Sequence, residues 1–419
     1  MELKRVVVTG IGAVTPIGNT VPELWDSIIN ARNGAAPITL FDPAKFKVRF
    51  ACEVKGFEPE QFIDRKELRK TDRYEQFAMV AADQAIADCG IDLEQTDKDR
   101  IGVIFGVGVG GLKTYETEML DYATVRDTTG PRFNPFLMTK LIANMASGFV
   151  SIKYGFRGPN FSTTAACASS NLAIAEAVNY IRLHKADMIL AGGAEAVITE
   201  SCVGAFSSMH ALSTRNESPA TASRPFSRSR DGFVLGEGGA VLVLEEYEHA
   251  VARGAKIYAE VAGCGLSADA YHMTAPDPEG NGAALVMHNA LADAGLDVAD
   301  IDYINLHGTS TPLGDVAEMN AVKRLFGKQA YKLNLSATKS MTGHLLGGAG
   351  ALEAVISILA LEHGIVPPTT NFSEGDEDPN VDYNLNFTFN KAQKRNIRTA
   401  LSNTFGFGGH NAAIVFKKI

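Results

Sequence analysis

Apolar runs rich in β-branched residues alternate along the chain with segments whose apolar positions recur every three or four residues. The runs indicate buried strands, and the three-to-four spacing indicates helices that bury one face. This alternation is typical of an α/β fold. In the first part of the chain it predicts strands near Arg5–Gly10, Ile101–Gly106, Met188–Gly192 and Ala240–Leu244, and helices near Val21–Ala31, Arg73–Cys89, Leu141–Tyr154 and Ala168–His184.

The same alternation restarts near Gly254. It predicts further strands at Lys256–Gly263, Ile301–Leu306, Leu401–Thr404 and Ala412–Lys417, and helices at Gly282–Ala294, Val316–Phe326 and Gly348–Glu362. The simplest interpretation is two similar α/β halves, residues 1–250 and 251–419, related by the order of their elements and not by sequence identity. Lys113–Pro135 fits neither pattern, and we expect a helical insertion or an oligomer contact there.

Composition narrows the functional classes. A net charge of −9 without a Lys/Arg-rich block argues against nucleic acid as the main partner. The five cysteines are scattered and form no Cys-x-x-Cys, which predicts neither a disulfide framework nor a metal site and favours a reducing, cytoplasmic setting. The sequence contains no run of about twenty apolar residues, so we expect no membrane-spanning helix. The short Val-rich run before Gly10 indicates a strand and not a signal peptide.

Cys167 stands where a Thr/Ala-rich extended stretch, Asn160–Ala166, gives way to a helical pattern. A thiol at such a turn lies near the free N–H groups and the positive dipole end of the helix, and both lower a thiol pKa. The position therefore predicts a nucleophilic thiolate. A buried structural cysteine is the alternative for any single cysteine.

Three further motifs carry chemistry. His307 ends the predicted strand Ile301–Leu306, where side chains in open α/β folds commonly face the site. His344 lies among small residues before an apolar helix. A glycine-rich turn, Phe405–Gly409, follows the strand Leu401–Thr404. Each motif is weak alone, but one cysteine with two loop histidines indicates thiol chemistry on a carbonyl group.

These motifs resemble those of the β-ketoacyl-[acyl-carrier-protein] synthase family, most closely its fatty-acid-elongating members. The resemblance runs from Val6 to Lys418. It rests on Cys167, the His-Gly-Thr-Ser-Thr block at His307, the Lys-Ser-Met-Thr-Gly-His block at Lys339, the Asn403–Gly409 turn, and the segments Ala211–Asn216, Ser223–Phe226, Asp231–Gly238 and Asp269–Thr274.

The resemblance implies a thiolase-like fold of two related α/β halves packed as αβαβα layers, and a homodimer. It implies decarboxylative condensation of acyl-acyl-carrier-protein with malonyl-acyl-carrier-protein through an acyl-cysteine. Substrates would arrive on the carrier's phosphopantetheine arm, without a bound cofactor. The implied catalytic residues are Cys167, His307, His344, Lys339 and Phe405.

The same resemblance implies supporting roles. Phe405 would gate malonyl entry, and its N–H would join that of Cys167 in an oxyanion hole. Lys339 would support His344 in a network with Glu353, or form a plain structural salt bridge. Substrate would contact Thr309, Thr311, Val109, Phe206, Thr274 and Phe407. The carrier protein would dock on the basic cluster with Lys66, Arg69 and Lys70, whose alternative is a solvated charged face.

Four related kinds of protein are the alternatives, and the sequence argues against some of them. A biosynthetic thiolase needs a second cysteine near the C-terminus, and no cysteine follows Cys264. The initiating synthases use Cys-His-Asn, whereas His344 favours Cys-His-His. A polyketide ketosynthase is closer, and a non-catalytic chain-length-factor subunit would lack the cysteine. His210 and His410 depart from the family pattern, and we expect them to affect only docking or the pocket rim.

Overall fold

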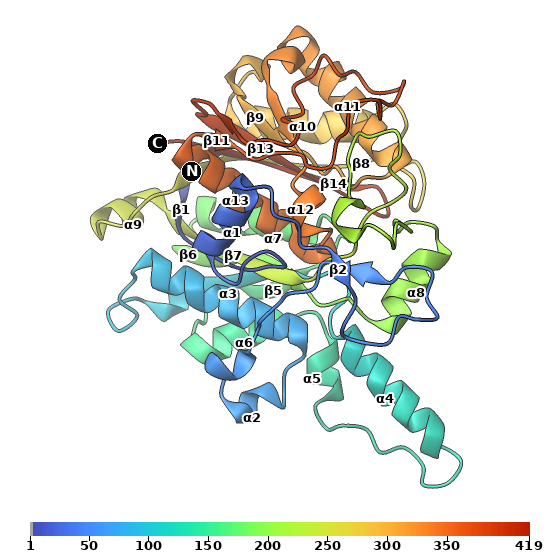
Figure 1. Ribbon diagram of the computed structural model, residues 1–419. Coiled ribbons are helices and arrows are strands. Elements are labelled where there is room, and N and C mark those ends of the chain that lie inside the picture. Colours follow the sequence, from blue (N-terminus) through green and yellow to red (C-terminus); the bar gives the residue numbers. More distant parts are fainter. Residues whose placement is uncertain (1–2) are drawn as a thin grey trace.

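A computed structural model describes residues 3–419, so the first two residues of the predicted first half lie outside it (Figure 1). Each half contributes five strands to a sheet. The strands of the first half are β1 (Val6–Val14), β4 (Ile101–Gly106), β5 (Asn160–Thr163), β6 (Met188–Glu195) and β7 (Gly238–Glu246). Those of the second are β8 (Ala259–Ala268), β9 (Tyr303–Asn305), β10 (Asn334–Ser336), β13 (Thr399–Gly406) and β14 (His410–Lys417).

The two sheets repeat one topology. Their strand orders are β1-β7-β6-β4-β5 and β8-β14-β13-β9-β10, so in each the first strand of the half pairs with the last. In the first sheet the pairings β1–β7 and β7–β6 are antiparallel, and β6–β4 and β4–β5 are parallel. In the second sheet β8–β14 and β14–β13 are antiparallel, and β13–β9 and β9–β10 are parallel. The predicted repeat of element order is confirmed. The predicted boundary between the halves at residue 250 falls inside helix α9 (Tyr247–Ala252) and stays a prediction.

Helices and sheets alternate in layers, as the resemblance implied (Figure 1). A short ladder between β1 and β8 joins the two sheets. Helices α7 (Ser169–Arg182) and α13 (Ala349–His363) lie between the sheets, α3 (Arg73–Cys89) covers the outer face of the first sheet, and α10 (Asn281–Ala294) and α11 (Pro312–Phe326) cover the outer face of the second. The remaining α-helices are α1 (Val21–Ile29), α2 (Arg65–Leu68), α4 (Leu112–Val125), α5 (Leu137–Leu141), α6 (Met145–Tyr154), α8 (Glu200–Ser208) and α12 (Lys339–Thr342).

Strand β7 shows why both faces of each sheet are apolar. Leu242 and Leu244 join the cluster around the central helices, whereas Val241 and Val243 join the cluster under α3. Successive side chains of a strand point to opposite faces, so a strand covered on both sides is apolar throughout. The central helix α13 is covered from all sides. The window Leu346–His363 is long and apolar enough to cross a membrane by length and composition, but 89% of it is buried inside the protein.

Two local predictions need comment. The predicted helix Leu141–Tyr154 is two helices, α5 and α6, because Ile142 adopts an extended backbone between them. The segment that fitted no pattern contains α4, a helix with no buried residue. Its lack of a buried face explains why hydrophobic periodicity did not reveal it. Two small ladders, β2 (Ala36–Pro37) with β3 (Phe50–Ala51) and β11 (Ile365–Val366) with β12 (Gln393–Lys394), complete the strands named in the structure.

Candidate active site

A cavity of about 500 Å³ opens where loops of the two halves meet. It brings together most of the predicted site residues, from segments far apart in the sequence. Those lining it are Val109, Cys167, Phe206, Thr274, His307, Thr309, Thr311, His344, Phe405 and Phe407. Within residues 3–419, no group of three or more His, Cys, Asp or Glu side chains is placed to hold a metal ion. One thiol and two imidazoles therefore line the same cavity.

Cys167 lies between β5 and the start of α7. The preceding residue, Ala166, has a φ of +47°, a conformation that costs a non-glycine residue about 1–3 kcal/mol. The strained turn is held by Ser169, whose hydroxyl accepts a hydrogen bond from the Ala165 N–H. Backbone hydrogen bonds from Phe407 and from Cys167 itself lower the pKa of the thiol. Two N–H groups that converge on a nucleophile can stabilise an oxyanion formed on a carbonyl attacked there.

The prediction of a lowered thiol pKa is wrong for the free site. Burial raises the pKa of Cys167 to about 12, while the charge of Lys339 and the two N–H groups lower it by less. Desolvation of the thiolate in this apolar surrounding exceeds the effect of the helix end. The raised pKa favours the protonated thiol in the free site.

His307 follows β9 and is fixed by its own backbone. Glu318 on α11 accepts hydrogen bonds from the N–H of His307 and of Gly308, both at 2.8 Å. The Glu318 carboxylate is buried, which raises its pKa to about 7. The sequence prediction did not include this residue. A lone acidic residue on the buried face of a helix would have been the signal.

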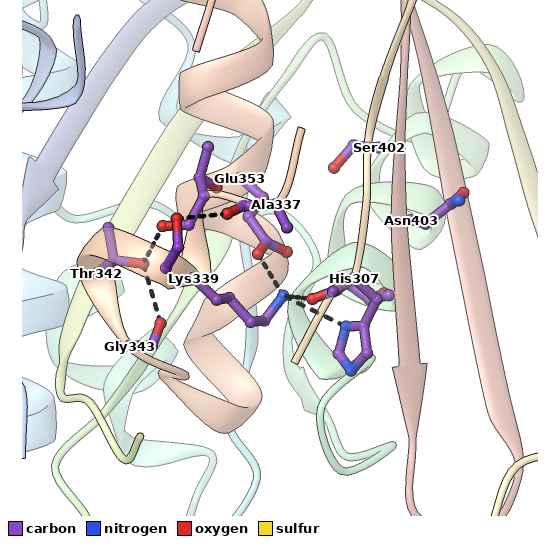
Figure 2. A network of polar contacts seen from close by, with 12 residues as sticks. His307, Ala337, Lys339, Thr342, Gly343, Glu353, Ser402 and Asn403 are labelled. Carbon is purple, nitrogen blue, oxygen red and sulfur yellow. Dashed lines mark hydrogen bonds and ion pairs between the residues drawn. The ribbon is translucent and has the colours of Figure 1, made fainter. Parts of the chain in front are cut away.

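Lys339 contacts His307 and Glu353, as Figure 2 shows. Its Nζ donates to the His307 carbonyl at 2.8 Å, lies 3.4 Å from His307 Nδ1, and pairs with the Glu353 carboxylate. Both members of the ion pair are 2% exposed. The predicted network with Glu353 is thus present. The Lys339 ammonium hydrogen-bonds to His307, and its charge also lowers the pKa of His344, so the expected support of His344 stays a prediction.

The contacts with Lys339 determine which ring nitrogen of His307 carries the proton. An ammonium has only donors, so the Nδ1 that faces it is an acceptor and the ring proton resides on Nε2. Burial, the Lys339 charge and the neighbouring His344 hold the pKa of His307 well below its usual value of 6.5. Burial and Lys339 do the same to His344. Two imidazoles held in the neutral form, with ring centroids 5.3 Å apart, therefore line the cavity.

The glycine-rich turn corrects one assignment. Phe405 belongs to strand β13, where it pairs with Asn411, and its ring lies 5.6 Å from that of His307. The N–H that points at the Cys167 sulfur is that of Phe407, not that of Phe405. Phe407 precedes Gly408 and Gly409, both at positive φ, and its ring lies 6.3 Å from that of Phe206. Both aromatic rings line the cavity, and Phe407 is the one followed by two glycines at positive φ. The gating role expected of Phe405 stays a prediction.

A loop between β9 and α11 presents two threonines to the cavity. The hydroxyls of Thr309 and Thr311 lie 3.0 Å apart. Between them Ser310 has a φ of +65° and donates its N–H to the buried Asp315. Asp315 in turn pairs with the buried Arg230 at 3.3 Å. A buried ion pair therefore holds a strained loop whose two hydroxyls can contact a polar substrate arm.

The predicted docking residues lie apart from the cavity. Lys66 and Arg69 are exposed on and beside α2, and Lys70 pairs with Glu67 at 2.8 Å. None of them lines the cavity. Of the two unusual histidines, His210 lines the cavity rim, and His410 is exposed with its ring against Gly408.

The fold and the cavity together define an acyl-transferring enzyme built on a duplicated α/β fold. The sequence matches the family described as beta-ketoacyl synthase, with its N-terminal domain at residues 3–250 and its C-terminal domain at residues 258–373. It is 48% identical to 3-oxoacyl-[acyl-carrier-protein] synthase 2 of Coxiella burnetii, over 100% of both chains.

Two solved structures are also similar. The ishigamide ketosynthase/chain length factor matches at a TM-score of 0.92 with 33% identity, over 100% of both chains. A type II polyketide synthase ketosynthase, in complex with its acyl-carrier protein and bound to a hexaketide, matches at 0.89 with 33% identity over 100% of both chains. This chain belongs to the beta-ketoacyl synthase family.

Proposed function

We propose that this enzyme elongates fatty-acid chains by condensing acyl-acyl-carrier-protein with malonyl-acyl-carrier-protein to 3-oxoacyl-acyl-carrier-protein. The observation that carries the proposal is the meeting of Cys167, His307 and His344 on one cavity. Relatives named as 3-oxoacyl-[acyl-carrier-protein] synthases at 48% and 47% identity support the reaction.

The first half-reaction charges the enzyme. The Cys167 sulfur attacks the acyl thioester, and the carbonyl oxygen becomes an oxyanion that accepts from the N–H groups of Cys167 and Phe407. The carrier sulfur then leaves as the pantetheine thiol, taking up the proton that the Cys167 thiol gives up. Losing one such N–H donor typically costs about 10²–10³ in rate.

The second half-reaction forms the carbon–carbon bond. Malonyl-acyl-carrier-protein loses CO₂, and the electron pair of the broken bond becomes an enolate on the thioester. His307 and His344 donate their ring N–H groups to the enolate oxygen. The enolate carbon attacks the acyl-cysteine carbonyl, and Cys167 leaves as a thiolate that takes up one proton. The hydrogen bond from Lys339 keeps His307 in the donor form.

Substrate binding uses the rest of the cavity. Thr309 and Thr311 hold the pantetheine arm through their paired hydroxyls, and Thr274 lines the same cavity. Val109 and Phe206 form the apolar wall for the acyl chain. The side chain of Phe407 moves on its glycine hinge to admit malonyl after acylation, and Phe405 forms the wall beside His307.

Substrates are carried by an acyl carrier protein, and the basic cluster at α2 receives it. A similar ketosynthase has been solved in complex with its acyl-carrier protein. Exposed Arg65, Lys66 and Arg69 form a local positive patch on a chain of net charge −9. Such a patch is sufficient to steer an acidic partner to the surface.

The active form is a homodimer that joins along β5. This strand ends its sheet, and among residues 3–419 no strand pairs with its outer edge. Nearby helices α4 and α5 bury none of their own residues. Ile152 on α6 is 73% exposed, and Met138 on α5 is 59% exposed. Pairing of two β5 edges would cover these apolar side chains and remove an open edge that favours aggregation.

A polyketide ketosynthase is the second candidate, because a type II polyketide synthase ketosynthase shares the whole fold at 33% identity. The higher identity to the fatty-acid relatives favours elongation of fatty acids. A silent chain-length-factor role is not favoured, since Cys167 is present with both histidines. The five free cysteines support a reducing, cytoplasmic setting.

The test is chemical trapping of the intermediate. Incubation with acyl-acyl-carrier-protein of graded chain length should place one acyl group on the peptide containing Cys167, as read by mass spectrometry. Malonyl-acyl-carrier-protein should then release it as the 3-oxoacyl product with an equal amount of CO₂. Cys167→Ala is the control and should give neither adduct nor product. Acylation elsewhere with Cys167 untouched would sink the proposal.

A further inference from the structure

The carboxylate of Glu195 lies at the end of β6 and is fully buried. Its Oε2 accepts from the N–H of Gly108 at 2.8 Å and of Gly347 at 3.1 Å. Its Oε1 accepts from the N–H of Val109 at 3.1 Å and of Gly110 at 3.2 Å. Four backbone amides therefore converge on a single side chain that no step of the reaction uses.

The amides come from two segments that are far apart in the sequence. Gly108, Val109 and Gly110 form the loop between β4 and α4 in the first half, and Gly347 belongs to the turn that follows His344 in the second half. The segments touch directly. A Cβ on Gly347 would lie 2.3 Å from the Gly108 nitrogen and 2.7 Å from Glu195 Oε2, closer than any side chain tolerates. Only glycine allows this approach.

Both segments line the active-site cavity. The first contributes Gly108 and Val109, and the second contributes His344 and Leu346. A shift of either segment would move a wall of the acyl site or a histidine, and small displacements of substrate-positioning groups cost large factors in rate. Glu195 is thus the point at which the acyl wall and the histidine turn are fixed to each other.

The four amides favour the ionised form of Glu195, whereas burial raises its pKa to about 7. An ionised carboxylate only accepts hydrogen bonds and offers about four lone-pair sites, which matches four N–H donors. A glutamine of the same shape would turn its NH₂ group toward one of the two N–H pairs. That pair would face a donor, and one segment would separate from the other.

We propose that Glu195 is a positioning residue that couples the acyl-chain wall at Val109 to the histidine turn at His344, and so sets which acyl chains proceed to condensation. This proposal rests on the proposed function, because it assigns the acyl chain to the Val109 wall. Glu195 acts through the backbone amides that it holds and not through contact with substrate.

The test compares Glu195→Gln with Glu245→Gln. Glu245 is also fully buried at a strand, but it accepts from Thr9, His249 and Arg253 and does not line the cavity. For each protein, kcat/KM for condensation is measured with acyl-acyl-carrier-proteins of graded length. E195Q should change the ratio of long-chain to short-chain kcat/KM about tenfold, by losing long chains first. E245Q should lower the melting temperature and leave the ratio unchanged.

The outcomes separate the two proposals. An unchanged ratio in E195Q, with only a lower melting temperature, would overturn the coupling while leaving the proposed function intact. If E195Q does not accumulate as folded protein, Glu195→Asp keeps the carboxylate but shortens the side chain, which weakens the same four hydrogen bonds, and is judged by the same ratio. If the unmodified enzyme condenses no acyl chain at all, the proposed function fails and the coupling fails with it.

Discussion

Replacing Lys339 by Met tests whether this lysine serves catalysis or only the fold. Met keeps the apolar stem but removes the ion pair with Glu353 and the donors to the carbonyl and Nδ1 of His307. Removing one partner of a buried pair costs about 3–5 kcal/mol. Loss of the donor that fixes His307 should lower malonyl decarboxylation by about 10²–10³, the effect of one misplaced oxyanion donor.

The stability cost depends on pH in a predictable direction. Burial raises the pKa of Glu353 to about 7, above that of a free glutamate, and the loss of Lys339 raises it further. A carboxyl whose pKa is raised in the folded state contributes stability below its unfolded pKa and loses it as the pH rises through the folded value. Lys339→Met should therefore unfold at lower urea concentration at pH 8 than at pH 6.

The double variant K339M/E353Q separates the two roles of the lysine. Gln removes the unpaired buried charge, so the urea midpoint followed by circular dichroism should recover most of its loss. Decarboxylation, followed as labelled CO₂ released from malonyl-acyl-carrier-protein, should stay low because no donor faces His307 Nδ1. Recovery of decarboxylation together with stability would refute the catalytic role and leave a structural salt bridge.

Three further predictions follow from the site. Because the pKa values of His307 and His344 lie well below 6.5, decarboxylation by the folded enzyme should show no loss on lowering the pH through 6.5; an inflection there would contradict neutral histidine donors. Phe407→Ala should raise the ratio of malonyl self-condensation to elongation more than Phe405→Ala does, since only Phe407 has its N–H at the sulfur and a glycine hinge beside it; equal ratios would argue against gating by Phe407. The pair Lys66→Glu and Arg69→Glu should raise KM for acyl-acyl-carrier-protein and leave kcat within about twofold; an unchanged KM at low salt would remove α2 from the docking surface.

The sequence predicted the architecture well where one physical signal dominated. Strand Ile101–Gly106 and helix Arg73–Cys89 were predicted to the residue, because the first is apolar on both faces and the second has Asp72 as an N-cap and Gly90 in the left-handed conformation after it. Helix α4 was expected only as one of two alternatives, a helical insertion or an oligomer contact, because it buries no face and shows no clear periodicity. Hydrophobic periodicity has no information about a helix that buries no apolar face.

The site was predicted as a set of residues and less well as a set of contacts. Motifs placed Cys167, His307 and His344 correctly on one cavity. The thiol pKa was wrong in direction, because burial depends on tertiary packing that sequence position does not reveal. The roles of Glu195 and Glu318 were missed for a similar reason. Each is a lone acidic residue in an apolar segment, and its hydrogen-bond donors are backbone amides.

The central claim is that Cys167 and the two histidines serve different half-reactions. Cys167 carries the acyl chain, and the two histidines stabilise the charge that develops on the malonyl thioester. The most direct measurement takes His307→Ala and His344→Ala and follows both half-reactions separately, as acyl transfer to Cys167 by mass spectrometry and as CO₂ release from malonyl-acyl-carrier-protein. Acyl transfer should stay within about tenfold of the unmodified enzyme, while decarboxylation falls by about 10²–10³ in each variant. Loss of acyl transfer with decarboxylation intact would contradict the account.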